Sequence, residues 1–169
     1  ASRRPWPPAT PVPVSPTLRC AAVMVDPDRS PADSERLLER RYLAQVLRTR
    51  HLRAELRSAT FLRAWGADAT PYDTATFGGP THLVVGDAAC FIDPLSSFGV
   101  KKALASAWNG AAVVETCLSR PELQGAALEF FAAEERATYE AQLDHSSRHA
   151  SLAAEAHKTA FWEARAAWM

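Results

Sequence analysis

The sequence predicts an α/β chain that is mostly helical, and three observations carry that prediction. Residues 83–85 form a short apolar, β-favouring run that is too brief for a helix, and Gly86 follows where a tight turn is needed. The segment 101–118 is dominated by Ala, Val and Leu, which is typical of a helix that packs closely on its neighbours. Two further segments, one after Ser30 and one after Ser119, place apolar residues at helical spacing. We therefore expect a strand, a turn and a buried helix, flanked by other helices.

The composition favours a soluble globular protein with a small-molecule or protein partner. The 169 residues are 47% hydrophobic and 22% charged, which suits one sizeable core. Lys plus Arg and Asp plus Glu both number 19, so nothing recommends nucleic acid or an anionic membrane as partner. No window approaches the roughly 18 apolar residues of a membrane span, and the N-terminus lacks the apolar core of a signal peptide.

The cysteines and histidines predict neither disulfides nor a metal site. Cys20, Cys90 and Cys117 are odd in number, widely spaced and without a C-x-x-C, so a reducing cytoplasm fits best. His145 and His149 share one helix face, but the Glu of an H-E-x-x-H site and a third ligand are missing. Cys90 is expected to pack as a small apolar group, because no cation is evident beside it.

The first 17 residues predict a Pro-rich leader. Six prolines in this segment favour extended or disordered backbone and exclude helix and interior strand. Pro8 and Pro11 have the spacing of a ligand for an SH3-type domain, which is the alternative interpretation. The next segment, 18–26, is an apolar run closed by Asp26-Pro27 and predicts a strand.

Helices account for most of the remaining chain outside 59–80. Ser30-Pro31 has the chemistry of an N-cap followed by Pro at the first helical position. The apolar stripe predicted for that helix comprises Leu38, Tyr42, Leu43, Val46 and Leu47. Its Arg-rich opposite side could bind phosphate, but interleaved Glu residues favour a solvated face with helical ion pairs. Loops with at most one short strand are expected over 59–79, and helices over 119–152 and 161–168.

The chemistry of the chain is concentrated in residues 81–102. Asp87 is expected at the carboxyl end of a strand, where open α/β sheets bind ligands and where a carboxylate can accept hydrogen bonds from ribose-like hydroxyls. The segment 96–100 leads into the helix, whose first N–H groups offer a site for a partially negative group.

This stretch resembles the second FAD motif of flavin-dependent monooxygenases of the p-hydroxybenzoate hydroxylase type, and more closely its version in tryptophan-halogenase-like flavoproteins. The positions that match in order and spacing are Gly86, Asp87, Ala88, Ala89, Asp93, Pro94 and Gly99. The resemblance implies FAD as cofactor, with Asp87 on the ribityl chain and 94–100 beside the isoalloxazine ring. The cofactor-binding residues that it implies are Gly86, Asp87, Ala88, Pro94, Phe98, Gly99 and Val100.

The family also carries a G-x-G-x-x-G fingerprint near its N-terminus, which none of the seven glycines supplies here. We therefore expect the C-terminal portion of a two-domain FAD-dependent oxidoreductase that lacks the N-terminal βαβ unit. Its expected parts are the leader 1–17, a substrate-domain remnant over 18–80, the FAD motif over 81–118 and C-terminal helices over 119–169. By the same resemblance, the strand over 18–26 would belong to the substrate-domain sheet and expose an unpaired edge.

The implied function is that of a flavin monooxygenase or halogenase acting on a small aromatic substrate, with NAD(P)H or a reductase as the source of electrons. No catalytic residue is identified, because the flavin carries the chemistry. Halogenases of the family have a hydroxyl residue directly before the Gly, whereas Phe98 stands there, and Trp6-Pro7 does not supply their Trp-x-Trp-x-x-Ile-Pro signature. Phe98 cannot donate a hydrogen bond to a halide, which favours a monooxygenase or dehydrogenase. The alternative is a non-catalytic fragment that acts as a helical binding or scaffold module.

Overall fold

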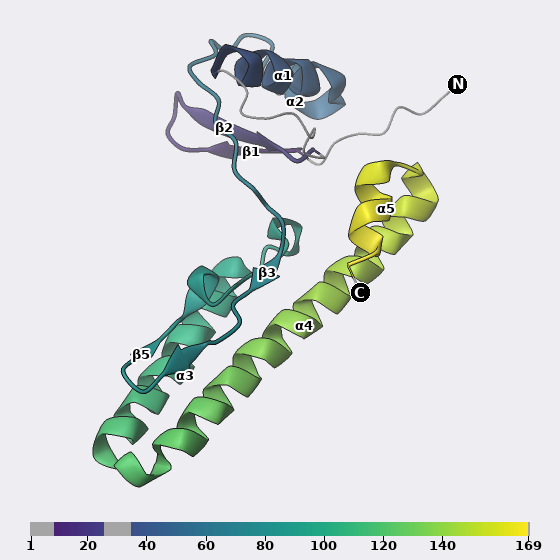
Figure 1. The fold of residues 1–169 in the computed structure, drawn as a ribbon. Coiled ribbons are helices and arrows are strands. Elements are labelled where there is room, and N and C mark those ends of the chain that lie inside the picture. Colours follow the sequence, from purple (N-terminus) through teal and green to yellow (C-terminus); the bar gives the residue numbers. More distant parts are fainter. Residues whose placement is uncertain (1–8, 26–34, 169) are drawn as a thin grey trace. The chain divides into compact units, whose positions relative to one another are not determined.

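The computed structural model describes residues 9–25 and 35–168 (Figure 1). The chain divides into two compact units, Ala1–Asp68 with His157–Phe161 and Ala69–Ala156 with Trp162–Met169. The first unit contains β1 (Ala9–Pro13), β2 (Arg19–Val23), α1 (Glu35–Arg48) and α2 (Arg50–Glu55). After residue 68 the elements in chain order are β3 (Tyr72–Asp73), β4 (Gly78–Gly79), β5 (His82–Leu83), η1 (Gly86–Ala88), β6 (Cys90–Phe91), η2 (Pro94–Ser96), α3 (Gly99–Ser119), η3 (Pro121–Leu123), α4 (Gln124–His157) and α5 (Ala160–Ala166).

The prolines of β1 are placed where a hairpin tolerates them. β1 pairs antiparallel with β2, and beyond the ladder the Val14 N–H donates to the Leu18 carbonyl at 2.9 Å. Because N–H groups alternate in direction along a strand, those at even positions face β2, and Pro11 and Pro13 fall where no donor is needed. The predicted extended backbone is therefore present over 9–13, but it is paired rather than loose. The hairpin covers one edge of β2, and β1 and β2 are the two strands of this sheet.

The predicted helix of the first unit is confirmed from Glu35, and its Ser30-Pro31 start lies outside the described residues. It ends at Arg48. The hydroxyl of the next residue, Thr49, donates to the Val46 carbonyl at 2.8 Å, and α2 follows. Val46 and Leu52 are buried, whereas Leu47, predicted to lie on the apolar stripe, is 63% exposed. Leu47 points elsewhere because it is offset by about 100° from Val46 around the helix.

In the second unit the predicted strand is shorter than expected. Of the segment predicted as a strand, residues 83–85, only Leu83 lies in one. This strand, His82–Leu83, pairs with Gly78–Gly79 in a small hairpin. All sheets within the described residues are two-stranded and antiparallel, so Asp87 lies in the 3₁₀ turn η1 and not at the end of a strand in an open sheet. A strand needs a hydrogen-bonding neighbour, and after Leu83 only the Val84 N–H continues the pairing, to the Phe77 carbonyl at 2.8 Å.

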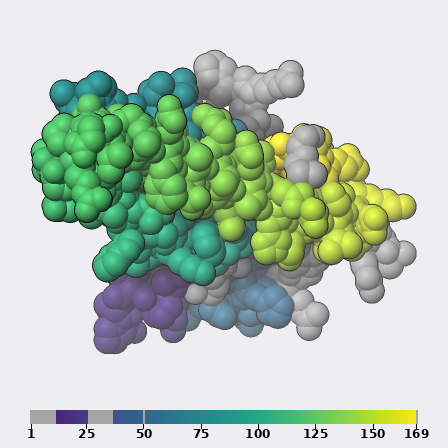
Figure 2. Space-filling view, turned by 90° about the horizontal axis from the view of Figure 1, so that it is seen from below, coloured from purple at the N-terminus to yellow at the C-terminus, as the bar shows by residue number. Residues whose placement is uncertain are grey.

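The core of this unit lies where α3 and α4 pack on the motif. Phe77, Ala89, Cys90, Val113 and Phe131 are its buried residues. The two helices run side by side, connected through η3 (Figure 1), and their teal and green surfaces touch in the space-filling view (Figure 2). A Cβ on Gly110 would lie only 3.2 Å from the Val85 side chain, so glycine permits this close approach of α3.

The helix predicted over 101–118 is confirmed as Gly99–Ser119, but only one of its faces is buried. The inward residues are Lys102, Ser106, Gly110 and Val113. Large apolar side chains on other faces are exposed: Val100, Leu104, Trp108, Val114 and Leu118. Across residues 9–25 and 35–168, no helix combines the length and apolar character needed to cross a membrane.

Candidate functional site

Two side chains of α3 hold the Gly-Asp turn in place. Gly86 adopts a left-handed conformation with φ of 63°, its N–H donates to Ser106 Oγ at 3.0 Å, and its carbonyl accepts from Lys102 Nζ at 2.9 Å. Lys102 and Ser106 are one helical turn apart, so both face the turn, and both are almost completely buried. We call this pair the polar clamp. It satisfies the Gly86 N–H and gives a second donor to the Gly86 carbonyl, which also accepts from the Ala89 N–H at 3.1 Å.

Lys102 extends the clamp along the turn. Its Nζ also donates to the Cys90 carbonyl and lies 3.4 Å from Asp87 Oδ1. An ammonium group has three donors, so one buried side chain ties together the start, the middle and the end of the turn 86–90. These contacts offset the cost of removing the charge from water.

The Asp87 carboxylate is held from the protein side and open on the other. Its side chain is 58% exposed although Lys102 approaches it from the interior. The Tyr72 hydroxyl donates to the Asp87 backbone carbonyl at 2.8 Å, and the Tyr72 ring stacks on Phe91 with centroids 5.9 Å apart. A supported, accessible carboxylate can accept hydrogen bonds from hydroxyl groups of a ligand.

Cys90 corrects one expectation, because a cation does lie beside it. Lys102 Nζ is 3.6 Å from Cys90 Sγ, yet burial raises the pKa of the thiol, and the nearby ammonium only partly opposes that rise. The side chain is completely buried. A neutral, inaccessible thiol is a packing group and not a nucleophile.

A buried ion pair fixes the loop between the turn and α3. Asp93 Oδ1 accepts from the Leu95 N–H at 3.0 Å and from Arg165 Nη2 at 3.2 Å. The Asp93 and Arg165 side chains are only 6% and 10% exposed. The pair joins the C-terminal segment to η2, and Ser97 then takes a left-handed conformation with φ of 54° before the helix begins.

The start of α3 offers an open helix N-terminus. Its first turn carries no acidic residue, and a Cβ built on Gly99 would meet nothing within 4 Å. Val100 is 77% exposed, while the half-buried Phe98 ring lies 4.8 Å from Lys101 Nζ. Free N–H groups and the helix dipole favour a partially negative group at such a position.

The structure places the predicted cofactor residues in two neighbouring places. Gly86, Asp87 and Ala88 form η1, which packs on α3. Pro94 lies in η2, and Phe98, Gly99 and Val100 form the entry into α3. Their roles toward FAD stay predictions.

Four supporting residues were missed at the sequence level: Tyr72, Lys102, Ser106 and Arg165. For Lys102 and Ser106 a local signal existed, since the two polar residues are four apart and so share one face of a helix rich in small and apolar residues. Tyr72 and Arg165 carry no such signal.

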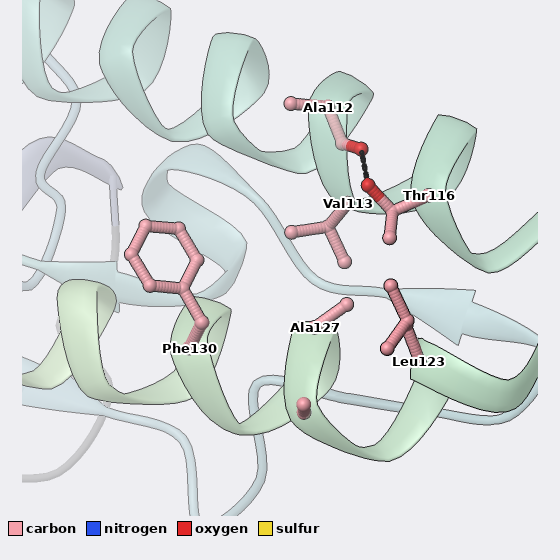
Figure 3. A pocket seen from close by; sticks show the side chains of 7 residues that line it. Ala112, Val113, Thr116, Leu123, Ala127 and Phe130 are labelled. Carbon is pink, nitrogen blue, oxygen red and sulfur yellow. Dashed lines mark hydrogen bonds between the residues drawn. The ribbon is translucent and has the colours of Figure 1, made fainter. Parts of the chain in front are cut away.

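Two other places among the described residues lack the features of a ligand site. His145 and His149 form an edge-to-face ring pair with centroids 4.4 Å apart, and the described residues hold no group of three or more potential metal ligands. A groove of about 310 Å³ lies between α3 and α4 (Figure 3). Its lining is apolar except for Thr116, whose hydroxyl donates to the Ala112 carbonyl at 2.9 Å, so it lacks convergent polar groups.

Gly86→Ala should lower the free energy of unfolding by about 1–2 kcal/mol, because an L-residue is strained at this φ. A clash is not the cause, since the added Cβ would meet Ala103 at 3.5 Å. Urea denaturation measures the loss. Gly125→Ala, in a helix with open space around it, is the control and should be neutral or stabilising. Equal effects of both substitutions would contradict the strained turn.

Comparison with known proteins shows similarity to two flavin-dependent halogenases. No family model matches the sequence. A flavin-dependent halogenase, gsfI of Penicillium aethiopicum, is 43% identical over 47 residues, which are 28% of this chain and 9% of that protein. The crystal structure of CmlS, a flavin-dependent halogenase, matches 75% of this chain with a TM-score of 0.68 and 25% identity.

The chain spans only 24% of CmlS, so the likeness concerns one part of a larger protein. Both of these proteins are named as flavin-dependent halogenases. The chain is therefore similar to flavin-dependent halogenases, over 47 residues in sequence and over three quarters of its length in fold.

Proposed function

We propose that this chain supplies the Gly-Asp turn and the helix start that contact FAD in a flavin-dependent, halogenase-like oxidoreductase. The observation that carries the proposal is the polar clamp, which presents the exposed Asp87 carboxylate within a fold similar to that of CmlS. The non-catalytic scaffold alternative is not favoured by relatives that are both named as enzymes.

The residues present fit the cofactor. Asp87 would accept hydrogen bonds from the ribityl hydroxyls, since its carboxylate is supported and accessible. The open N-terminus of α3 at Gly99 and Val100 would face the electron-rich pyrimidine edge of the ring system. The surface next to these FAD contacts would be formed by Ala88, Pro94 and Phe98. When bound, FAD supplies the redox chemistry, and these residues bind and orient it.

The exposed side of α3 supports a role within a longer flavoprotein. Val100, Leu104, Trp108 and Leu118 are between 68% and 80% exposed, which leaves an apolar stripe uncovered along the helix. A Gly-rich unit for the FAD pyrophosphate is not found in these 169 residues. We propose that a nucleotide-binding part of the full-length protein supplies that unit and covers the stripe.

The proposed substrate is a small aromatic compound, and electrons would come from NAD(P)H or a separate reductase. Both are carried over from the resemblance to the family.

The three described cysteines are free thiols, which fits a reducing compartment such as the cytoplasm.

The test is product analysis with the full-length protein. We would supply FAD, a reductase with NADH, oxygen and bromide, offer a panel of phenols, indoles and pyrroles, and identify products by mass. Brominated product is expected. A flavin-free protein without product would contradict the proposal.

Hydroxylation is the second candidate, and Phe98 is the observation that favours it. A product that gains oxygen and no bromine, at every bromide concentration, would assign this chemistry instead. Ser97 is the hydroxyl residue nearest to the position that Phe98 occupies, and its side chain is exposed. Ser97→Ala would therefore show whether that hydroxyl contributes to halide use, because bromination alone would fall.

A further inference from the structure

We propose that Lys102 is a positioning residue of the flavin site, which acts on the cofactor through Asp87 and does not touch it. The inference rests on the proposed function. Lys102 is 1% exposed, so no ligand can reach its ammonium group. Asp87, 3.4 Å from that group, is the exposed member of the pair.

The contacts of Lys102 are arranged to orient one carboxylate. Its Nζ donates to the Gly86 and Cys90 carbonyls, which lie on either side of Asp87 in the chain. The ammonium is thereby fixed beneath the turn, and Asp87 Oδ1 is drawn toward a fixed charge. A carboxylate held in one orientation binds hydroxyl groups with a smaller loss of side-chain freedom.

Lys102 has two separable roles at this place. Its Nζ donates to the Gly86 and Cys90 carbonyls of the buried turn, so its loss is expected to lower the stability of the turn. It also places a positive charge 3.4 Å from Asp87 Oδ1, and this second role concerns the cofactor. What an apolar residue could not do is hold the Asp87 carboxylate.

A double-mutant cycle in the full-length protein tests this role. Lys102→Met, Asp87→Asn and the double variant are compared with wild type by FAD titration, and thermal unfolding without FAD reports the fold. Lys102→Met should weaken FAD binding roughly tenfold when Asp87 is present, because the carboxylate loses its fixed partner. In the Asp87→Asn background the same substitution should change FAD affinity less than about twofold, because coupled residues are not additive.

Lys158→Met removes an exposed lysine and is the matched control, with unchanged affinity expected. If Lys102→Met does not fold, Lys102→Gln keeps a donor for the carbonyls without the charge and enters the same cycle. Equal losses in both Asp87 backgrounds would overturn the positioning role and leave Lys102 as a support of the turn. A wild-type protein that binds no FAD would instead overturn the proposed function.

Discussion

Arg165→Met should lower the free energy of unfolding by about 3–5 kcal/mol, the largest effect that we expect from any single substitution. The guanidinium is the charge that compensates Asp93, whose side chain is 6% exposed. Without it, the Asp93 carboxylate stays buried with only the Leu95 N–H as partner among the contacts described above. Arg165 also lies 4.7 Å from the ring centroid of Trp168, a contact that is lost as well. Chemical denaturation of the purified chain measures the change.

Arg148→Met is the matched control for that experiment. Arg148 pairs with Asp144 at 2.9 Å, but its side chain is 74% exposed, and solvent screens such pairs. We expect a change within about 0.5 kcal/mol for this variant. Adding Asp93→Asn to Arg165→Met should recover part of the loss, since the uncompensated charge is then gone. Similar losses for the Arg148 and Arg165 variants would contradict a buried ion pair.

Asp87→Ala should reduce the FAD affinity of the full-length protein by roughly tenfold to a hundredfold while the fold stays intact. Charge-assisted hydrogen bonds are worth about 1.5–3 kcal/mol, which corresponds to that range of affinity. The chain should still fold, with some loss of stability, because Lys102 loses its counter-charge but keeps its two carbonyl partners. Flavin fluorescence titration gives the affinity, and circular dichroism gives the fold.

Glu122→Ala removes an exposed acid on η3, outside the motif, and controls for loss of negative charge. Its FAD affinity should match that of the wild type. If Asp87→Ala matched it too, the assignment of 81–102 as an FAD motif would be wrong.

The turn and the helix of the site show where prediction from sequence succeeds. Gly86 predicted a tight turn, and the structure gives it a left-handed conformation that other residues rarely adopt. The helix after Gly99 followed from a segment dominated by small and apolar residues, and α3 begins and ends within two residues of the predicted bounds. Both features are set by residues that are neighbours in the chain.

The partners of these residues were decided by tertiary structure alone. Arg165 is 72 residues from Asp93, and nothing in either local pattern links the two. A lysine is expected at the surface, yet helix packing places Lys102 inside, where its Nζ donates to the Gly86 carbonyl. Strand length was misjudged over 83–85 for the same reason, since pairing depends on which backbone lies alongside. The sequence by itself thus determined the turn, the helix and the resemblance to flavoproteins, because these depend on short-range conformational preference. The polar clamp, the buried ion pair and the hairpin around the prolines required the folded chain, because contacts between distant residues are not encoded in any local pattern.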